Sequence, residues 1–196
     1  MDEAPMLFIG EKLGSGNGPE IDIAVDPVEG TNFVAKNLPG AMTVLAISEK
    51  GNLFNAPETY MEKIASGSHI PKNTLDLDYS LEKNIKNYSD ATNKKIKDIT
   101  VCILNRPRHN RIIKELNRLK VNIKYISDGD VLGALLVSNK KFRVDIFMGT
   151  DGGPEGGIAA SDLKTLEWIF QGRFLFKSAG EINRAHKKGL NDVYYR

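Results

Sequence analysis

Two apolar segments predict the strands of the first part of the 196-residue chain. Ile21, Ile23 and Val25 alternate with residues that are charged or small, which is typical of a short strand. Residues 41–48 are almost continuously apolar and predict a buried strand. After a turn, residues 52–55 are expected to continue as its hairpin partner.

The pattern is less regular in the segments around these strands. Residues 6–9 predict a further strand, and residues 59–65 predict a helical turn that presents Tyr60. Residues 72–97 are polar and rich in Lys, Asn and Asp, so we interpret them as a linker and a solvated helix. The chain is therefore expected to divide into two lobes within this polar segment.

From residue 98 onward, segments with strand periodicity alternate with segments with helix periodicity. The expected strands lie at 99–104, 121–126 and 144–148, and the expected helices at 112–119, 131–137 and 158–170. Trp168 and Phe170 are interpreted as core residues of the last helix. A β-α-β-α-β-α order predicts a mostly parallel sheet with helices packed on it.

These elements predict an α/β protein with three segments. Residues 1–75 form an α+β first lobe, residues 76–97 a linker with a solvated helix, and residues 98–196 a parallel α/β lobe.

Composition and charge narrow the class of protein further. The formal net charge of +2 gives no strong field toward nucleic acid or an anionic membrane. No apolar run approaches the length of a membrane span, and no signal peptide is visible. Cys102, the single cysteine, lies in an apolar run and is interpreted as core filler. The sequence thus predicts a cytoplasmic enzyme or binding domain.

A pair of carboxylates after the first strand is the best candidate for metal chemistry. Pro27 is expected to end the strand because it has no N–H to donate, which places Asp26 and Glu29 together in a turn that Gly30 allows. Two close carboxylates repel each other unless a cation lies between them, and Mg²⁺ or Mn²⁺ takes such oxygen ligands. Thr31 adds a hydroxyl that can reach a metal-bound water or a phosphate oxygen.

Three polar loops follow the strands of the second lobe. They are Asn105–His109, Ser127–Asp130 and Gly149–Glu155. In open α/β sheets ligands bind at the carboxyl ends of the strands, where helix N-termini also favour anions. Arg106 and Arg108, held apart by Pro107, suit a phosphate dianion. Either Asp128 or Asp130 is expected to cap the helix that follows.

The motifs resemble a known family. The string from Asp26 to Thr31, D-P-V-E-G-T, resembles a signature of metal-dependent, lithium-sensitive sugar and inositol phosphatases. Five further motifs occur in order at Asp2–Glu11, Tyr60–Ile64, Arg106–His109, Asp128–Asp130 and Pro154–Gly156. Together, over nearly the whole chain, they resemble class II fructose-1,6-bisphosphatase.

The resemblance implies both a fold and an activity. The fold is a layered α-β-α-β-α sandwich, here incomplete. The activity is hydrolysis of the 1-phosphate of fructose 1,6-bisphosphate with Mn²⁺ (or Mg²⁺), in gluconeogenesis, by a homo-oligomer (dimer or tetramer) when complete. Sedoheptulose 1,7-bisphosphate fits the same logic. An inositol-phosphate type phosphatase and an inactive sugar-phosphate-binding fragment stay open as alternatives.

The resemblance also assigns roles to individual residues. The implied metal ligands are Asp26, Glu29 and Glu155, and the implied catalytic residues are Thr31, Asp26 and Glu29. The implied substrate-binding residues are Glu29, Gly30, Thr31, Tyr60, Arg106, Pro107, Arg108, Asp128, Gly129, Asp130 and Gly152.

The sequence departs from the family pattern in two places. A Gly-Glu-Gly-Glu segment and an upstream aspartate, which hold metal in the family, do not precede Asp2. The 196-residue chain alone is therefore expected to have little activity and to be poorly soluble. Residues 149–153 and the Glu167–Trp168 pair also differ from the family pattern, which leaves the third loop less well defined.

Overall fold

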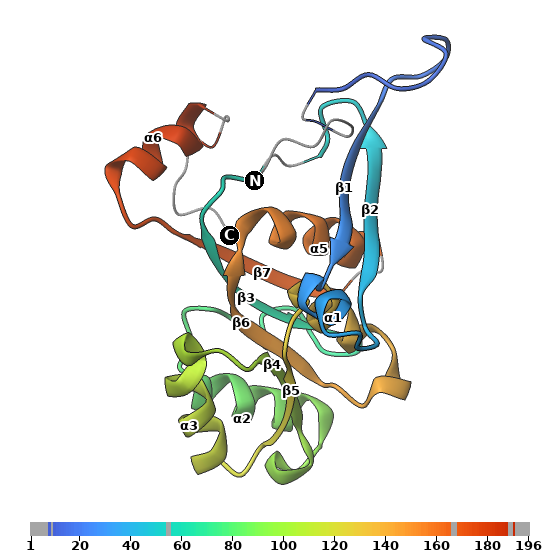
Figure 1. The fold of residues 1–196 in the computed structure, drawn as a ribbon. Helices are drawn as coiled ribbons and strands as arrows, with labels where there is room; N and C mark the ends of the chain where they lie inside the picture. The colour runs from blue at the N-terminus through green and yellow to red at the C-terminus, as the bar shows by residue number, and fades with distance from the viewer. Residues whose placement is uncertain (1–7, 9, 54–55, 166–167, 188–189, 191–196) are drawn as a thin grey trace.

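The computed structural model describes residues 8, 10–53, 56–165, 168–187 and 190, and the side chains of all of these except 161–165 and 187. It contains a two-stranded sheet, β1-β2, and a five-stranded sheet in the order β5-β4-β6-β3-β7 (Figure 1). Helices cover the larger sheet, which confirms the predicted α/β class. No described helix is both long and apolar enough to cross a membrane. Most of the strand expected at residues 6–9 lies outside the described residues.

The two-stranded sheet is an antiparallel hairpin of β1 (Ile21–Glu29) and β2 (Met42–Glu49), with α1 (Thr31–Ala35) in the connection. Pro27 was expected to end β1 but does not. The ladder shifts register after Asp26 and resumes where Glu29 faces Met42. The predicted pairing of β2 with residues 52–55 is wrong, since its partner is β1; residues 54 and 55 lie outside the described part.

The five-stranded sheet is mixed, but four of its strands run in the same direction, so the mostly parallel arrangement expected for the second lobe is confirmed. Its strands are β3 (Tyr60–Ser66), β4 (Thr100–Leu104), β5 (Asn122–Ile126), β6 (Ile146–Gly152) and β7 (Ile169–Leu175). β4 runs parallel to β5 and β6, as the alternating pattern predicted. The exception is β3, which inserts between β6 and β7 and runs antiparallel to both.

Two sequence predictions fail around β3 and β7. Residues 59–65, expected as a helical turn, form most of β3. The last expected helix, 158–170, is instead α5 (Gly153–Thr165) followed by β7, so Phe170 is in a strand and Trp168 precedes it. Both aromatic residues do pack against the core. The large sheet draws strands from both sides of the expected linker, and the lobe boundaries stay a prediction.

Side chains of successive strand residues point to opposite faces of the large sheet, and helices cover both faces. Ile64 and Ile146 pack in one cluster with residues of α2 (Leu81–Thr92) and α3 (Asn110–Arg118). Ala65 and Phe147, the next residues along, pack in another cluster with residues of α4 (Asp130–Leu135) and α5. The sheet is therefore the middle layer of three, as Figure 1 shows.

The helix α2 was expected to be solvated, but one of its faces is part of the core. Ser80 caps its N-terminus by accepting from Lys83 N, and Ile85 and Tyr88 are buried in the cluster with α3. The remaining helical segments are α6 (Ala179–Lys187) and the short turns η1 (Ile96–Asp98), η2 (Pro107–His109), η3 (Leu136–Ser138) and η4 (Lys140–Phe142). Cys102 is fully buried, as predicted, and burial raises the pKa of its thiol to about 12.

Candidate active site

The strand register brings the predicted site residues to one edge of the large sheet. Tyr60, the first residue of β3, faces Gly152 at the end of β6 and Leu175 at the end of β7. β4 and β5 run parallel to β6, so they end at the same edge. The loops that follow all four of these strands therefore meet where β3 begins, which is the edge at which α/β sheets bind ligands.

The end of the hairpin is joined to this edge by two reciprocal hydrogen bonds. Glu29 Oε1 accepts from Val131 N at 2.8 Å, at the start of α4. Asp128 Oδ2 accepts from Asn32 N at 2.9 Å, at the start of α1. The acceptor for α4 thus comes from a residue 102 positions away, whereas the sequence predicted a cap from Asp128 or Asp130.

Gly30 is required at the turn between these contacts. Its φ of +80° is in the left-handed region, and a Cβ there would lie 2.6 Å from Cδ2 of Phe33. Any other residue would displace the aromatic ring that packs under the turn.

Glu29 lies in an environment that disfavours its charge. Its exposed fraction is only 5%. Burial, the neighbouring charge of Asp130 and the nearby Asp26 together raise the pKa of Glu29 to about 8, while the Val131 N–H acts in the opposite direction. The structure therefore brings the predicted pair Asp26 and Glu29 into contact, and the charge of Asp130 acts on Glu29 from nearby.

Glu155 lies at the start of α5, against the loop that ends β6. Its Oε2 is buried and has no hydrogen-bond partner among the described residues, and burial raises the pKa of its carboxyl. A Cβ at Gly152 would lie 2.0 Å from this oxygen, so Gly152 makes room for it. A buried oxygen without a donor is suited to a cation.

The oxygen atoms of these carboxylates are the type of ligand that a hard divalent ion binds. Their arrangement in the structure, however, is not a complete metal-binding site. Among the described residues, no three Asp, Glu, His or Cys side chains are grouped closely enough to hold a metal ion. The structure thus brings Asp26 to Glu29 and does not add Glu155 to them.

Sequence reasoning missed Lys63, which joins two of the loops. This lysine is 1% exposed, forms a buried ion pair with Asp130, and donates from Nζ to Gly152 O at 2.6 Å. Burial still raises the pKa of Asp130 despite the opposing effect of the lysine. The segment Met61–Ala65 also contains Glu62, so the sequence offered no clear signal of a buried lysine, which needs a paired charge.

The two predicted phosphate-binding arginines lie at the same edge and have different partners. Arg106 Nη2 lies 2.9 Å from Asp128 Oδ1. Arg108 donates to Asp151 Oδ2 at 2.7 Å and to Thr150 O at 2.6 Å. The separation expected from Pro107 is therefore present, and each guanidinium is partly neutralised by a carboxylate.

His109 was left out of the predicted chemistry, and its contacts are structural. Its ring is fully buried. Nε2 accepts from Thr150 N at 2.9 Å, so Nδ1 carries the proton and donates to Leu104 O at 2.7 Å. The ring thus ties the end of β4 to the end of β6.

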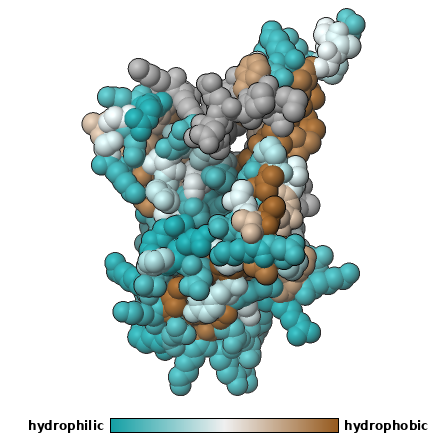
Figure 2. All heavy atoms as spheres, viewed as in Figure 1, coloured by the Kyte–Doolittle hydropathy of each residue, from teal (hydrophilic) through white to brown (hydrophobic). Residues whose placement is uncertain are grey.

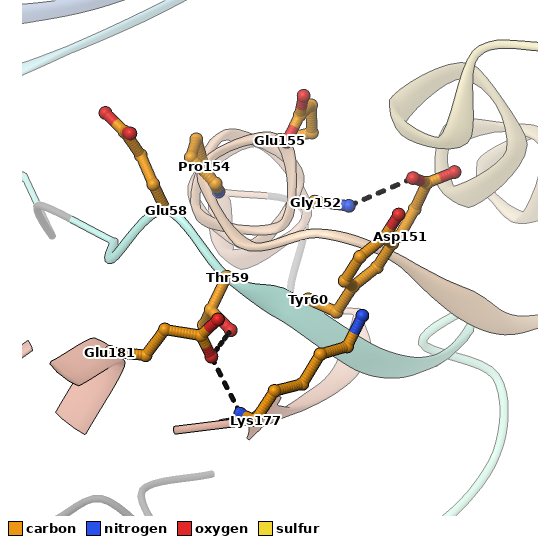
Figure 3. A pocket seen from close by; sticks show the side chains of 9 residues that line it. All are labelled: Glu58, Thr59, Tyr60, Asp151, Gly152, Pro154, Glu155, Lys177 and Glu181. Atoms are coloured by element: carbon orange, nitrogen blue, oxygen red, sulfur yellow. Dashed lines mark hydrogen bonds between the residues drawn. The ribbon is translucent and has the colours of Figure 1, made fainter. Parts of the chain in front are cut away.

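A pocket of about 380 Å³ opens beside Tyr60. Its walls include Asp151, Gly152 and Glu155 from the end of β6 and the start of α5, and Lys177 from the segment after β7 (Figure 3). Thr31, by contrast, begins α1 at an exposed position. The pocket therefore contains the predicted Tyr60, Gly152 and Glu155, with Lys177 as an addition.

Comparison with known proteins agrees with this arrangement. The fold and the site define an α/β protein with carboxylates and cationic side chains gathered at one sheet edge. Residues 1–195 match the family model of "Bacterial fructose-1,6-bisphosphatase, glpX-encoded", and the chain belongs to this family. The resemblance to class II fructose-1,6-bisphosphatase drawn from the motifs is thereby confirmed.

Two curated relatives show how much of such a protein the chain represents. It is 43% identical over 188 residues to "Fructose-1,6-bisphosphatase 1 class 2" of Escherichia coli (strain K12), covering 94% of this chain and 56% of the relative. It is 40% identical over 205 residues to "D-fructose 1,6-bisphosphatase class 2/sedoheptulose 1,7-bisphosphatase" of Prochlorococcus marinus (strain MIT 9301), covering 98% of this chain and 61% of the relative. The chain thus spans less than two thirds of the length of these relatives.

Proposed function

We propose that this chain supplies the substrate-binding edge and part of the metal site of a phosphatase that converts fructose 1,6-bisphosphate to fructose 6-phosphate and phosphate. The observation that supports this most directly is the buried Glu29, which lies beside Asp26 and Asp130 and is hydrogen-bonded to the start of α4. The carboxylates lie at the same sheet edge as two arginines, in a member of the fructose-1,6-bisphosphatase family.

Asp26, Glu29 and Glu155 are the residues that would hold Mn²⁺ or Mg²⁺. The raised pKa of Glu29, about 8, and the buried, unpartnered Oε2 of Glu155 both fit carboxylates that need a cation. When bound, such an ion lowers the pKa of a water and neutralises charge on the phosphoryl oxygens. Mn²⁺ is our first choice, as in the motif-based expectation.

Thr31 would orient the scissile phosphate or the attacking water from the start of α1. Its position follows directly from the turn at Gly30, which the left-handed backbone fixes beside Glu29. A hydroxyl next to the metal carboxylates can hold one phosphoryl oxygen in line for displacement.

The opposite end of the substrate would be held by Tyr60, Arg106 and Arg108. The arginines are positioned by Asp128 and Asp151, and a phosphate dianion offers them a stronger partner than these part-exposed carboxylates. The loops at Asp128–Asp130 and Gly152 would take the sugar hydroxyls.

Sedoheptulose 1,7-bisphosphate remains a second substrate candidate, because the name of the Prochlorococcus relative includes both activities. An inositol-phosphate type phosphatase needs no second phosphate site, so the paired arginines count against it. Homo-oligomer formation stays a prediction from the resemblance, and a cytoplasmic location stays a prediction from the composition of the sequence.

The test is phosphate release by the purified protein with Mn²⁺ or Mg²⁺. The substrates are fructose 1,6-bisphosphate, sedoheptulose 1,7-bisphosphate, fructose 1-phosphate and inositol 1-phosphate. In a protein of the relatives' full length we expect release from the bisphosphates with Mn²⁺ or Mg²⁺ and little release from inositol 1-phosphate, whereas the 196-residue chain alone is expected to release little phosphate. Calorimetric binding of bisphosphate without phosphate release would support the inactive-fragment alternative, and equal turnover of inositol 1-phosphate would contradict the proposal.

A further inference from the structure

Lys177 follows β7 and lies at the edge where the substrate is expected to bind. Leu175, the last residue of β7, is the register partner of Tyr60 at the beginning of β3. Lys177 is two residues further along and lines the same pocket as Tyr60. Figure 3 shows its side chain extending toward the tyrosine ring.

Lys177 has a fixed backbone and an exposed side chain. Its backbone N donates to Glu181 Oε2 at 2.7 Å, and Thr59 Oγ1 lies 3.2 Å from the same carboxylate oxygen and 2.9 Å from Leu175 O. These contacts hold the start of the Lys177 side chain beside β3. A positioned residue with an exposed charge needs little reorganisation when an anion binds.

The ammonium of Lys177 is directed at Tyr60. Its Nζ lies 4.4 Å from the centroid of the Tyr60 ring, and Arg108 Cζ lies 5.5 Å from the same centroid. Both distances are within the range of cation–π contact. Both cationic side chains thus lie against the Tyr60 ring.

Arg108 and Lys177 differ in whether the positive charge already forms an ion pair with a carboxylate. Arg108 already contacts Asp151 Oδ2 at 2.7 Å. In the part of the chain that the structure describes, no carboxylate oxygen lies within the 4.0 Å ion-pair distance of Lys177 Nζ. Lys177 is therefore the cation at this end of the pocket that can neutralise an incoming anion without breaking an existing ion pair.

A phosphate can bind in this pocket only if a cation is close to it, because most of the charged residues that line the pocket are acidic. Glu58, Asp151, Glu155 and Glu181 line it, and Lys177 is the one cationic residue among its described lining residues. A phosphate dianion would be repelled by this set of carboxylates unless a positive charge lies close to it.

We propose that Lys177 is a further substrate-binding residue, whose ammonium acts with Tyr60 and Arg108 to bind the phosphate that is not hydrolysed. Lys177 thereby contributes to the preference for a sugar bisphosphate over a sugar monophosphate. The inference rests on the proposed function, which assigns the sugar phosphate to this edge.

The experiment compares Lys177→Gln with Lys177→Arg and with a matched control, Lys86→Gln, on the exposed side of α2. KM and kcat are measured with Mn²⁺ for fructose 1,6-bisphosphate and for fructose 1-phosphate, and binding of both is measured by calorimetry. For Lys177→Gln we expect KM and Kd for the bisphosphate to rise roughly tenfold, the effect of one charge-assisted hydrogen bond. We expect kcat and the monophosphate values to change little, Lys177→Arg to recover most of the affinity, and Lys86→Gln to behave as the wild type.

The possible results test the role of Lys177 separately from the proposed phosphatase activity. A bisphosphate KM and Kd in Lys177→Gln equal to those of Lys86→Gln would overturn the role of Lys177 while leaving the phosphatase intact. Equal losses on both substrates would overturn it as well, because the lysine would then not be specific for the distal phosphate. If the wild-type protein binds bisphosphate without hydrolysing it, calorimetry still decides the role of Lys177; if it binds no sugar phosphate, both proposals are wrong.

Discussion

The β1–β2 hairpin and the β3–β7 sheet are built from similar apolar strands but are covered very differently. In the large sheet Ile64 and Ile146 are 2% and 0% exposed, since helices pack on both faces. In the hairpin Ile23, Leu45 and Ile47 are 48%, 50% and 57% exposed. Figure 2 shows hydrophobic surface along the hairpin.

The register explains which face of the hairpin is open. Ile23 faces Ile47 and Val25 faces Leu45, so these four side chains share one face. Val44 lies on the other face, where it is buried in the core cluster that includes Ala159 of α5. One face of the hairpin is thus anchored to the body of the protein, and the other face has no cover in the described part of the chain.

The comparison teaches that the two regions contribute differently to stability and to the proposed chemistry. The covered sheet holds most of the core and carries Glu155 and the proposed phosphate-binding residues at its edge, whereas two of the proposed metal ligands, Asp26 and Glu29, come from the half-covered hairpin. Glu29 reaches the sheet edge through its bond to Val131 N, supported by the bond between Asp128 and Asn32 N. Substitutions in the two regions should therefore affect different measurements.

The largest effect is expected on activity, from Asp26→Asn in the hairpin. A neutral amide is a poorer ligand for a hard dication, and loss of several kcal/mol of metal-assisted stabilisation corresponds to roughly 100-fold or more in kcat/KM. Asp22→Asn, in the same strand, is the control because Asp22 accepts from Gly51 N at the far end of the hairpin. Near-normal turnover of Asp26→Asn at saturating Mn²⁺ would show that Asp26 is no ligand.

A large effect on stability is expected from Lys63→Met in the sheet. The substitution leaves Asp130 buried without its partner, which should lower the free energy of unfolding by about 3–5 kcal/mol. The matched substitution Lys50→Met removes the exposed pair with Glu20 in the hairpin and should cause no measurable change. Urea unfolding of both variants tests the contrast, and similar midpoints for the two would contradict it.

Replacing one isoleucine by alanine in each region should also lower the free energy of unfolding by different amounts. Ile146→Ala removes a fully buried side chain and should cost about 2–5 kcal/mol. Ile47→Ala removes an exposed side chain and should stay within about 0.5 kcal/mol of the wild type. A loss at Ile47 as large as that at Ile146 would mean that the hairpin face is covered in solution.

A pH-dependent decline in stability is expected from Glu29. Its pKa rises from an ordinary value of 4.5 to about 8 on folding, so the folded state keeps a proton that the unfolded state has lost. Stability is therefore full below pH 4.5 and falls as pH rises through about 8 in metal-free buffer. Glu29→Gln should remove this decline, measured by urea unfolding at several pH values, and Mn²⁺ should reduce it in the wild type. A parallel decline in Glu29→Gln would assign the effect to other groups.

The smallest change in stability is expected from Ile23→Thr combined with Ile47→Thr. The exposed pair offers an apolar surface for self-association, which fits the expectation that the chain is poorly soluble. The double variant should be more soluble than the wild type, measured by light scattering against concentration, with an unchanged unfolding midpoint. Unchanged scattering would show that this face does not cause association.

The sequence alone determined the local elements and the candidate chemistry of this protein. Hydrophobic periodicity located β4, β5 and β6 and the helices between them, because each of these elements buries its own apolar face against its neighbours along the chain. The motif at Asp26–Thr31 and the loops after the strands were sufficient to suggest the family, which the comparisons confirmed.

Only the tertiary structure decided how distant segments combine. The position of β3 between β6 and β7, the bond from Glu29 to α4, and the buried pair of Lys63 and Asp130 all join residues far apart in the chain. Local patterns contain no information about such partners, since pairing depends on which surfaces meet after the chain has folded back. The same reason applies to Lys177, which has no motif of its own and comes to Tyr60 only because β7 runs antiparallel to β3.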